Sequence, residues 1–130
     1  MKKVLVIEDN EDNMSLITFI LQKGGYNTIW AENGRKGVEL AEREKPHFII
    51  LDIQLPDIDG FEVLRQIRAS KADARVPIIA MTSYAMSGDR EKLMKAGCTG
   101  YIEKPIDPET VMEEIHKIIK KNSDILTSGF

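Results

Sequence analysis

The sequence predicts an α/β fold in which helices cover both faces of a five-stranded parallel sheet. Two short apolar runs, residues 4–7 and 48–51, are continuous and do not alternate with polar residues. Continuous runs are typical of parallel strands that are buried on both faces. Apolar runs of this kind also alternate along the chain with longer amphipathic stretches, which is the order of successive βα units.

Five runs are predicted as strands, and each is followed by a helical pattern. The strands are residues 4–7, 28–31, 48–51, 77–81 and a weaker 100–102. Gly24, Pro46 and Gly97 are expected to end the first, second and fourth helices. The apolar positions that mark the five helices are Met14, Ile17 and Leu21; Val38 and Ala41; Val63, Leu64 and Ile67; Leu93 and Met94; and Val111, Met112, Ile115, Ile118 and Ile119.

The C-terminal residues carry no such pattern. We expect one domain over residues 1–121 and a disordered tail over residues 122–130.

Composition narrows the class of protein. The chain has 130 residues, 18 Lys and Arg against 21 Asp and Glu, and a net charge of −3. This mildly acidic balance argues against direct nucleic-acid binding, which usually needs a basic face. The single cysteine, Cys98, excludes an internal disulfide and a multi-cysteine zinc site. No apolar stretch is long enough for a membrane span or a signal peptide, so we expect a cytoplasmic protein.

Carboxylates follow two of the predicted strands. The first strand runs into Glu8 and Asp9, and the third runs into Asp52. In open α/β sheets, ligands bind beyond the carboxyl ends of the strands where the strand order reverses. If these two strands are neighbours, three carboxylates converge and need a cation or a shared proton. Oxygen ligands favour Mg²⁺. The alternative is that such acids are only helix caps, and Asn10 is a plausible cap of the first helix.

Two later strands end in polar residues of a different kind. Thr82 follows the fourth strand, and Lys104 follows the fifth. Taken singly, each is more often an ordinary strand-end hydroxyl or a solvated lysine. Together with the acids they indicate a phosphate site, in which an aspartate can attack phosphorus and form an aspartyl phosphate.

Four segments resemble the receiver domains of two-component response regulators. They are residues 4–10 (VLVIEDN), 51–60 (LDIQLPDIDG), 80–83 (AMTS) and 101–105 (YIEKP). The resemblance covers about residues 2–121, nearly the whole chain, and residues 84–97 resemble the version seen in single-domain regulators of the DivK type and in receiver domains of hybrid kinases. It implies a flavodoxin-like (βα)5 three-layer sandwich with strand order 2-1-3-4-5.

The resemblance also implies a role for each matching residue. Asp52 would be the phosphoacceptor. The Mg²⁺ ion would use Asp9 directly, Glu8 through water, an oxygen of Asp52 and the backbone carbonyl of Gln54. Lys104 would pair with the phosphoryl group and Thr82 would hydrogen-bond to it. Two further positions match the family: Tyr101 as a switch residue that moves with Thr82, and Pro105 as a cis-proline.

The implied function is a phosphorylatable switch and not a metabolic enzyme. The phosphoryl group would come from a phosphohistidine of a histidine kinase or histidine phosphotransfer protein. A changed surface of helix 4, strand 5 and helix 5 would then regulate a downstream signalling protein, with the chain a monomer or a phosphorylation-dependent dimer. Tyr84 and Met86 would belong to this surface, and a bulky Tyr84 would shield the acyl phosphate.

Other functions remain to be compared with this one. The chain could be a receiver domain cut from a hybrid histidine kinase and act in a phosphorelay. An aspartate-nucleophile phosphatase needs its nucleophile after the first strand, but the best candidate here follows the third. A flavodoxin needs a phosphate loop where this chain has the acidic residues 8–12. A receiver-like domain without phosphorylation is disfavoured by the presence of Asp52, Thr82 and Lys104.

Overall fold

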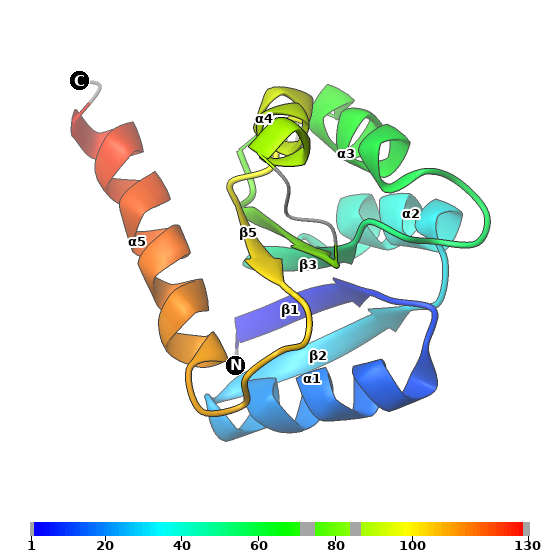
Figure 1. Cartoon of the computed structure of the whole chain (residues 1–130), viewed down its shortest axis with the longest axis vertical. Coiled ribbons are helices and arrows are strands. Elements are labelled where there is room, and N and C mark those ends of the chain that lie inside the picture. The colour runs from blue at the N-terminus through cyan, green and yellow to red at the C-terminus, as the bar shows by residue number, and fades with distance from the viewer. Residues whose placement is uncertain (1, 71–74, 84–86, 129–130) are drawn as a thin grey trace.

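A computed structural model describes residues 2–70, 75–83 and 87–128, and its sheet has five parallel strands in the order β2-β1-β3-β4-β5 (Figure 1). The order reverses between β1 and β3, so these two strands are neighbours with Ile7 opposite Leu51. The carboxyl ends of β1, β3 and β4 therefore meet at one edge. The strands are β1 (Lys2–Ile7), β2 (Tyr26–Ala31), β3 (Phe48–Asp52), β4 (Ile78–Thr82) and β5 (Gly100–Glu103).

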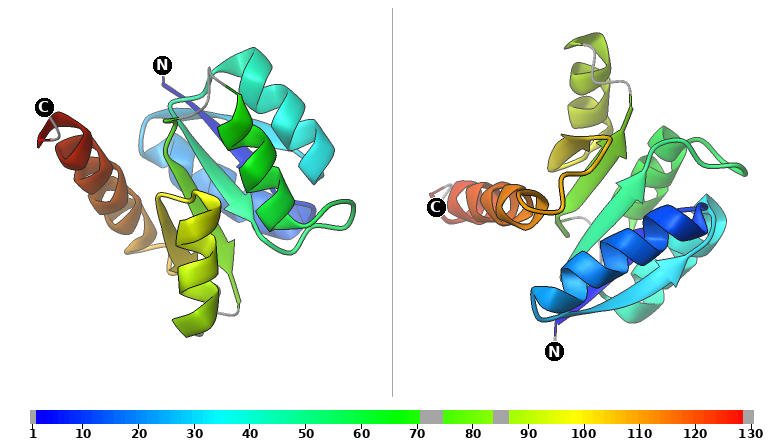
Figure 2. Two further views of the ribbon diagram at one scale, coloured as in Figure 1. Left: turned by 90° about the horizontal axis from the view of Figure 1, so that it is seen from above. Right: turned by 60° about the horizontal axis from the view of Figure 1, so that its bottom comes forward.

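Five helices cover the two faces of the sheet (Figure 2). Buried residues of α1 and α5 belong to one core cluster, and those of α2, α3 and α4 belong to the other. The three-layer α/β sandwich that the sequence predicts is thus confirmed. The helices are α1 (Glu11–Lys23), α2 (Gly34–Glu44), α3 (Gly60–Ala69), α4 (Ser87–Ala96) and α5 (Val111–Ser128).

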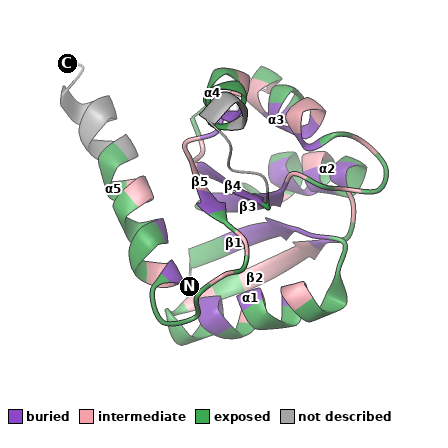
Figure 3. Cartoon of the chain, in the orientation of Figure 1, coloured by how far each residue is buried: buried purple, intermediate pink, exposed green. Residues whose placement is uncertain are grey.

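The central strands explain the continuous apolar runs. Leu5 and Ile49 face the α2–α3–α4 side, while Val6 and Ile50 face the α1–α5 side. All four side chains are at most 1% exposed, and Figure 3 shows this burial along the middle of the sheet. Burying each such side chain contributes about 1.5–3 kcal/mol. Because helices cover both faces of the sheet, every position of its central strands is apolar, and polar and apolar residues do not alternate along them.

Helix α5 differs from the prediction at its C-terminal end. The sequence analysis expects a disordered tail from residue 122, but α5 continues to Ser128. Residues 122–128 contain neither glycine nor proline, so nothing in the backbone stops the helix before Gly129.

Arg68, at the end of α3, connects the amino-terminal end of the sheet to the end of α4. Its Nε donates to the carbonyl of Gly97 at 2.8 Å, and its guanidinium also donates to the carbonyl of Val76 at 2.5 Å. Thr99 accepts from the same guanidinium at 3.4 Å and from the N–H of Ile78 at 3.0 Å. These bonds fix the loops that enter β4 and β5.

Among the described residues, no helix is long and apolar enough to span a membrane.

Candidate functional site

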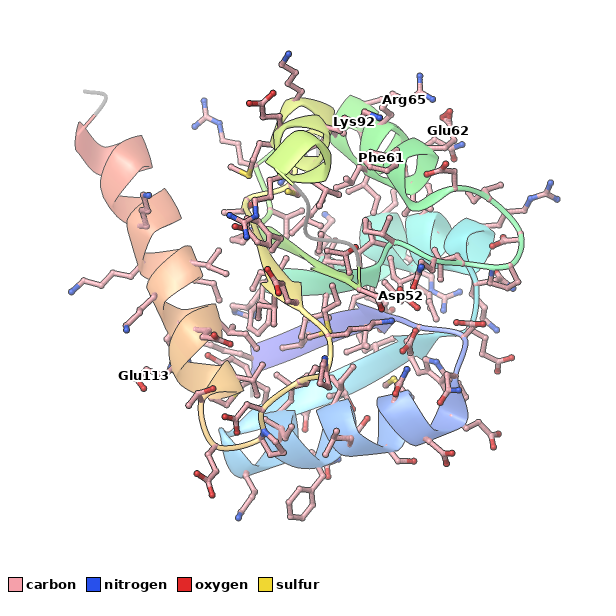
Figure 4. The ribbon with its side chains drawn as sticks, viewed as in Figure 1. Asp52, Phe61, Glu62, Arg65, Lys92 and Glu113 are labelled. Atoms are coloured by element: carbon pink, nitrogen blue, oxygen red, sulfur yellow. The ribbon has the colours of Figure 1, made fainter. Side chains whose placement is uncertain are left out.

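Three carboxylates meet where β1 and β3 end. One oxygen from each of Glu8, Asp9 and Asp52 lies within 4.8 Å of the other two. Glu8 and Asp52 are 2% and 5% exposed, whereas Asp9 is exposed to solvent. Figure 4 shows Asp52 at the end of β3, on the sheet edge where these strands finish. The convergence expected from the sequence therefore occurs in the fold.

Asp52 is held by a lysine and a backbone amide. The Nζ of Lys104 lies 3.0 Å from Oδ1 of Asp52, and the N–H of Gln54 donates to the same oxygen at 3.0 Å. The side chain of Lys104 is only 19% exposed, so water screens this ion pair less than a surface pair. The ammonium offsets part of the negative charge that three carboxylates bring together.

Glu8 is the least solvated member of the trio. Burial, together with a hydrogen bond and charge repulsion from Asp52, raises the pKa of Glu8 to about 8, although Asn13 and Lys104 act in the opposite direction. Its Oε2 atom is buried and has no hydrogen-bond partner among the described residues. Leaving a carboxylate oxygen buried and unpaired is costly. The three carboxylates offer negatively charged oxygen ligands, and one of these oxygens lacks a hydrogen-bond partner among the described residues. This set of ligands fits a hard divalent cation such as Mg²⁺.

Thr82 lies on β4, which pairs with the strand of Asp52, and Tyr101 lies on β5, one strand further out. Thr82 ends β4 and is 4% exposed, and its carbonyl accepts from the N–H of Lys104 at 2.9 Å. Tyr101 on β5 is opposite Ala80 and half-buried, and the guanidinium carbon of Arg90 lies 5.1 Å from the centre of its ring. The peptide bond between Lys104 and Pro105 is cis, at the position where the resemblance implies such a bond.

Two further acids of the loop after Asp52 cap helices. Asp57 accepts hydrogen bonds from the N–H groups of Gly34 and Arg35, at 2.8 and 3.0 Å, at the start of α2. Desolvation opposes ionisation of Asp57, but these bonds outweigh it and lower its pKa. Asp59 caps α3 through the N–H of Phe61 at 2.7 Å. The helix-cap explanation is therefore correct for these two acids, whereas Glu8, Asp9 and Asp52 form the cluster.

Two residues near the pocket were missed by the sequence analysis as parts of the site. The indole N–H of Trp30 donates to the carbonyl of Glu8 at 2.6 Å and fixes the backbone beside the acids. Asn13 interacts with the Glu8 carboxylate from the first turn of α1. Asn10 caps α1 through the N–H of Asn13 at 2.9 Å, as predicted. An apolar strand pattern gives no signal for the Trp30 contact, because it depends on the register between β1 and β2.

The alternatives can now be compared with the structure. The nucleophile candidate Asp52 ends β3 and not β1, which does not match an aspartate-nucleophile phosphatase. Glu8 and Asp9 directly follow β1, where a flavodoxin would bind phosphate. Tyr84 and Met86 lie outside the described residues.

Comparison with known proteins gives one consistent result. A family model described as the response regulator receiver domain matches residues 4–116. The polar-differentiation response regulator DivK of Brucella anthropi is 40% identical over 114 residues, which cover 88% of this chain and 93% of that protein. DivK of Brucella ovis is 39% identical over the same lengths.

Solved structures agree with this family and with the fold. The receiver domain of the sensor histidine kinase PA1611 from Pseudomonas aeruginosa, solved with a magnesium ion coordinated in its active site cleft, is 35% identical with a TM-score of 0.83; the match covers 92% of this chain and 98% of that one. The chemotaxis response regulator CheY4 of Vibrio cholerae is 27% identical, with a TM-score of 0.86 and coverages of 91% and 98%. Strand order, acidic pocket and sequence together show that this chain belongs to the response regulator receiver domain family of two-component signalling.

Proposed function

We propose that this chain is a phosphorylatable switch whose phosphoacceptor is Asp52, and that it is not a metabolic enzyme. The observation that carries the proposal is the buried Asp52 carboxylate, with Lys104 at 3.0 Å and two further acids within 4.8 Å. A carboxylate placed in this way can act as a nucleophile toward phosphorus while the lysine offsets charge on the transferred group.

The donor in this proposal is a phosphohistidine on a histidine kinase or a histidine phosphotransfer protein. A carboxylate oxygen of Asp52 forms the new bond to phosphorus, the bond from phosphorus to the imidazole nitrogen breaks, and the electron pair leaves with the imidazole. Lys104 pairs with the transferred phosphoryl oxygens, and the Thr82 hydroxyl donates a hydrogen bond to one of them. Because Asp52 is already fixed by Gln54 and Lys104, positioning supplies a large part of the rate.

The metal in this proposal is Mg²⁺, as the acidic donor set and the unpaired Oε2 of Glu8 suggest. Asp9, Asp52, the carbonyl of Gln54 and, through water, Glu8 would hold it. When bound, it would neutralise charge between the carboxylates and the phosphoryl oxygens.

The output in this proposal is a changed surface formed by α4, β5 and α5. Thr82 lies between the pocket and this surface, since it ends β4 and its carbonyl binds the backbone of the β5–α5 loop. A hydrogen bond from its hydroxyl to the phosphoryl group would move Thr82 and free space for Tyr101. The charge of the phosphoryl group would thereby shift the equilibrium between two conformations of the α4–β5–α5 surface. We propose a downstream signalling protein as the reader, and the cytoplasm as the place of action.

The test is Mg²⁺-dependent labelling with a small-molecule phosphodonor, together with beryllofluoride binding followed by NMR. Wild type should be labelled on one aspartate, and Asp52→Asn should lose the label while keeping its fold. Asp57→Asn is the matched control, because Asp57 caps a helix and should remain dispensable for labelling. Equal labelling of wild type and Asp52→Asn would reject the assignment.

A further inference from the structure

The two edges of the sheet are protected to different degrees. Strand β5 has four residues, ends in Glu103 and is flanked by an ion pair from that residue to Arg90 at 3.2 Å. Strand β2 has six residues (YNTIWA), none of them charged and none of them proline. Proteins usually block exposed edges with charges, prolines or short strands. Among the described residues, β2 pairs only with β1, so no strand covers its outer edge.

The outward backbone groups of β2 can be assigned from one hydrogen bond. The N–H of Glu8 donates to the carbonyl of Ala31 at 3.0 Å, so the polar groups of Ala31 point toward β1. Backbone polar groups alternate along a strand, and those of Tyr26, Thr28 and Trp30 therefore point away from β1. Three residues thus present N–H and C=O groups along one line, and no residue in the described part of the chain is hydrogen-bonded to them.

The side chains of β2 restrict which strand can pair there. Thr28 and Trp30 line a groove toward α1, while Ile29 and Ala31 pack against the core on the opposite face. A two-fold axis perpendicular to the sheet keeps the α1 faces of two copies on the same side. Residues that lie opposite each other across this axis have side chains on the same face of the sheet. Each of Tyr26, Thr28 and Trp30 must therefore lie opposite one of these three residues in the second copy.

We propose that this chain associates with a second copy of itself through antiparallel pairing of the two β2 strands. The register that uses all three outward residues places Thr28 opposite Thr28 of the second copy and Tyr26 opposite Trp30. Each of these is a hydrogen-bonded pair, so this register gives the two strands a continuous set of backbone hydrogen bonds. An uncharged, self-complementary edge suits a second copy better than a charged partner strand.

Apolar surface next to the β2 edge also supports a second copy of this chain as the partner. Phe19 on α1 is 59% exposed and lines the groove of about 510 Å³ between α1 and β2. A second copy placed beside β2 would cover this groove. Because the interface uses neither α4, β5 nor α5, it forms with or without phosphorylation and leaves the proposed output surface free.

Cysteine cross-linking tests the register directly. In the proposed dimer the Thr28 positions are a hydrogen-bonded pair, about 5.5 Å apart between Cα atoms, which a disulfide can bridge. Thr28→Cys should therefore form a covalent dimer under mild oxidation with copper phenanthroline. Asn27→Cys is the matched control, since two such positions are offset by about 7 Å along the strand and should not cross-link. Native Cys98 is 5% exposed and should not react. Equal cross-linking of both variants would overturn the proposal.

Sedimentation velocity tests the association without a cross-link. Wild type should shift from one chain toward two between about 1 µM and about 1 mM, since a small interface gives a weak dimer. Thr28→Pro removes an outward N–H that β1 does not use and should keep the chain monomeric, whereas Thr28→Val keeps the N–H and the dimer. Wild type that stays monomeric to 1 mM, a Thr28→Pro variant that still dimerises, or a dimer that forms only with Mg²⁺ and beryllofluoride would each overturn the inference.

Discussion

The acidic pocket and the α4–β5 side of the sheet are built in different ways. Asp52 ends a strand whose side chains are almost fully buried, and it is fixed by an ion pair and a backbone N–H, both at 3.0 Å. On the α4–β5 side, Arg90 contacts Glu103 and the ring of half-buried Tyr101, and the side chains of Arg90 and Glu103 are 46% and 56% exposed. The pocket thus stands on a rigid support, whereas the surface that we propose responds to phosphorylation has more exposed contacts, as expected of low-stability moving elements.

The largest expected difference between the two regions is in stability. Ile50→Ala removes a side chain that is 1% exposed beneath the pocket and should lower the free energy of unfolding by about 2–5 kcal/mol. Met94→Ala, at a position on α4 that is 51% exposed, should change it by less than about 0.5 kcal/mol. Urea unfolding measures both, and similar losses would contradict the contrast in packing.

The next effect concerns Lys104, the lysine beside the proposed phosphoacceptor. Lys104→Met leaves three carboxylates without their ammonium partner and should destabilise the metal-free protein by about 2–3 kcal/mol, near the lower bound for breaking a buried pair. Mg²⁺ should raise the melting temperature of this variant more than that of wild type, because the cation replaces the lost charge. Lys104→Arg is the control, and calorimetry with and without Mg²⁺ is the measurement. Identical Mg²⁺ effects in all three proteins would contradict this role.

The third effect is the pH dependence of metal binding. Burial and Asp52 raise the pKa of Glu8 to about 8 from 4.5, so the folded chain keeps a proton that the unfolded chain releases. Without metal, stability should fall as pH rises between these two values. Mg²⁺ binding must release the proton, and its affinity should therefore rise up to tenfold per pH unit from pH 6 toward 8.

Glu8→Gln provides the control for this behaviour. The neutral amide has no proton to lose, so Mg²⁺ affinity, measured by calorimetric titration, should become much less dependent on pH. An unchanged pH slope in this variant would assign the linkage to another group.

The smallest effect is expected at Arg90. Its ion pair with Glu103 joins side chains that are 46% and 56% exposed, so Arg90→Ala should change stability by less than about 1 kcal/mol. Loss of the guanidinium over Tyr101 should still shift the ring resonances of that residue in NMR spectra. Arg65→Ala, which breaks the exposed pair with Glu62 on α3, is the matched control and should leave those resonances unchanged. Destabilisation of several kcal/mol by Arg90→Ala would show that this side is not weakly held.

Most of the fold was predictable because its signal is local. Continuous apolar runs identified the strands, and the positions of Glu8 and Asp52 at their ends identified the pocket. The remaining features depend on long-range placement. Whether an acid such as Asp57 belongs to the pocket or caps α2 depends on where α2 begins in space, and the hydrogen bond from Trp30 depends on the β1–β2 register. The end of α5 was missed because periodicity detects burial and not helicity.

The guanidinium of Arg68 has a consequence for how α4 can move. By binding the carbonyls of Gly97 and Val76 it fixes the C-terminal end of α4 to the base of β4. The opposite end follows the strand that finishes at Thr82. A helix fixed at one end tilts like a lever, with the largest displacement at the other. A shift at Thr82 that reaches this end would therefore tilt α4 about Arg68, with a displacement that decreases toward its C-terminal end.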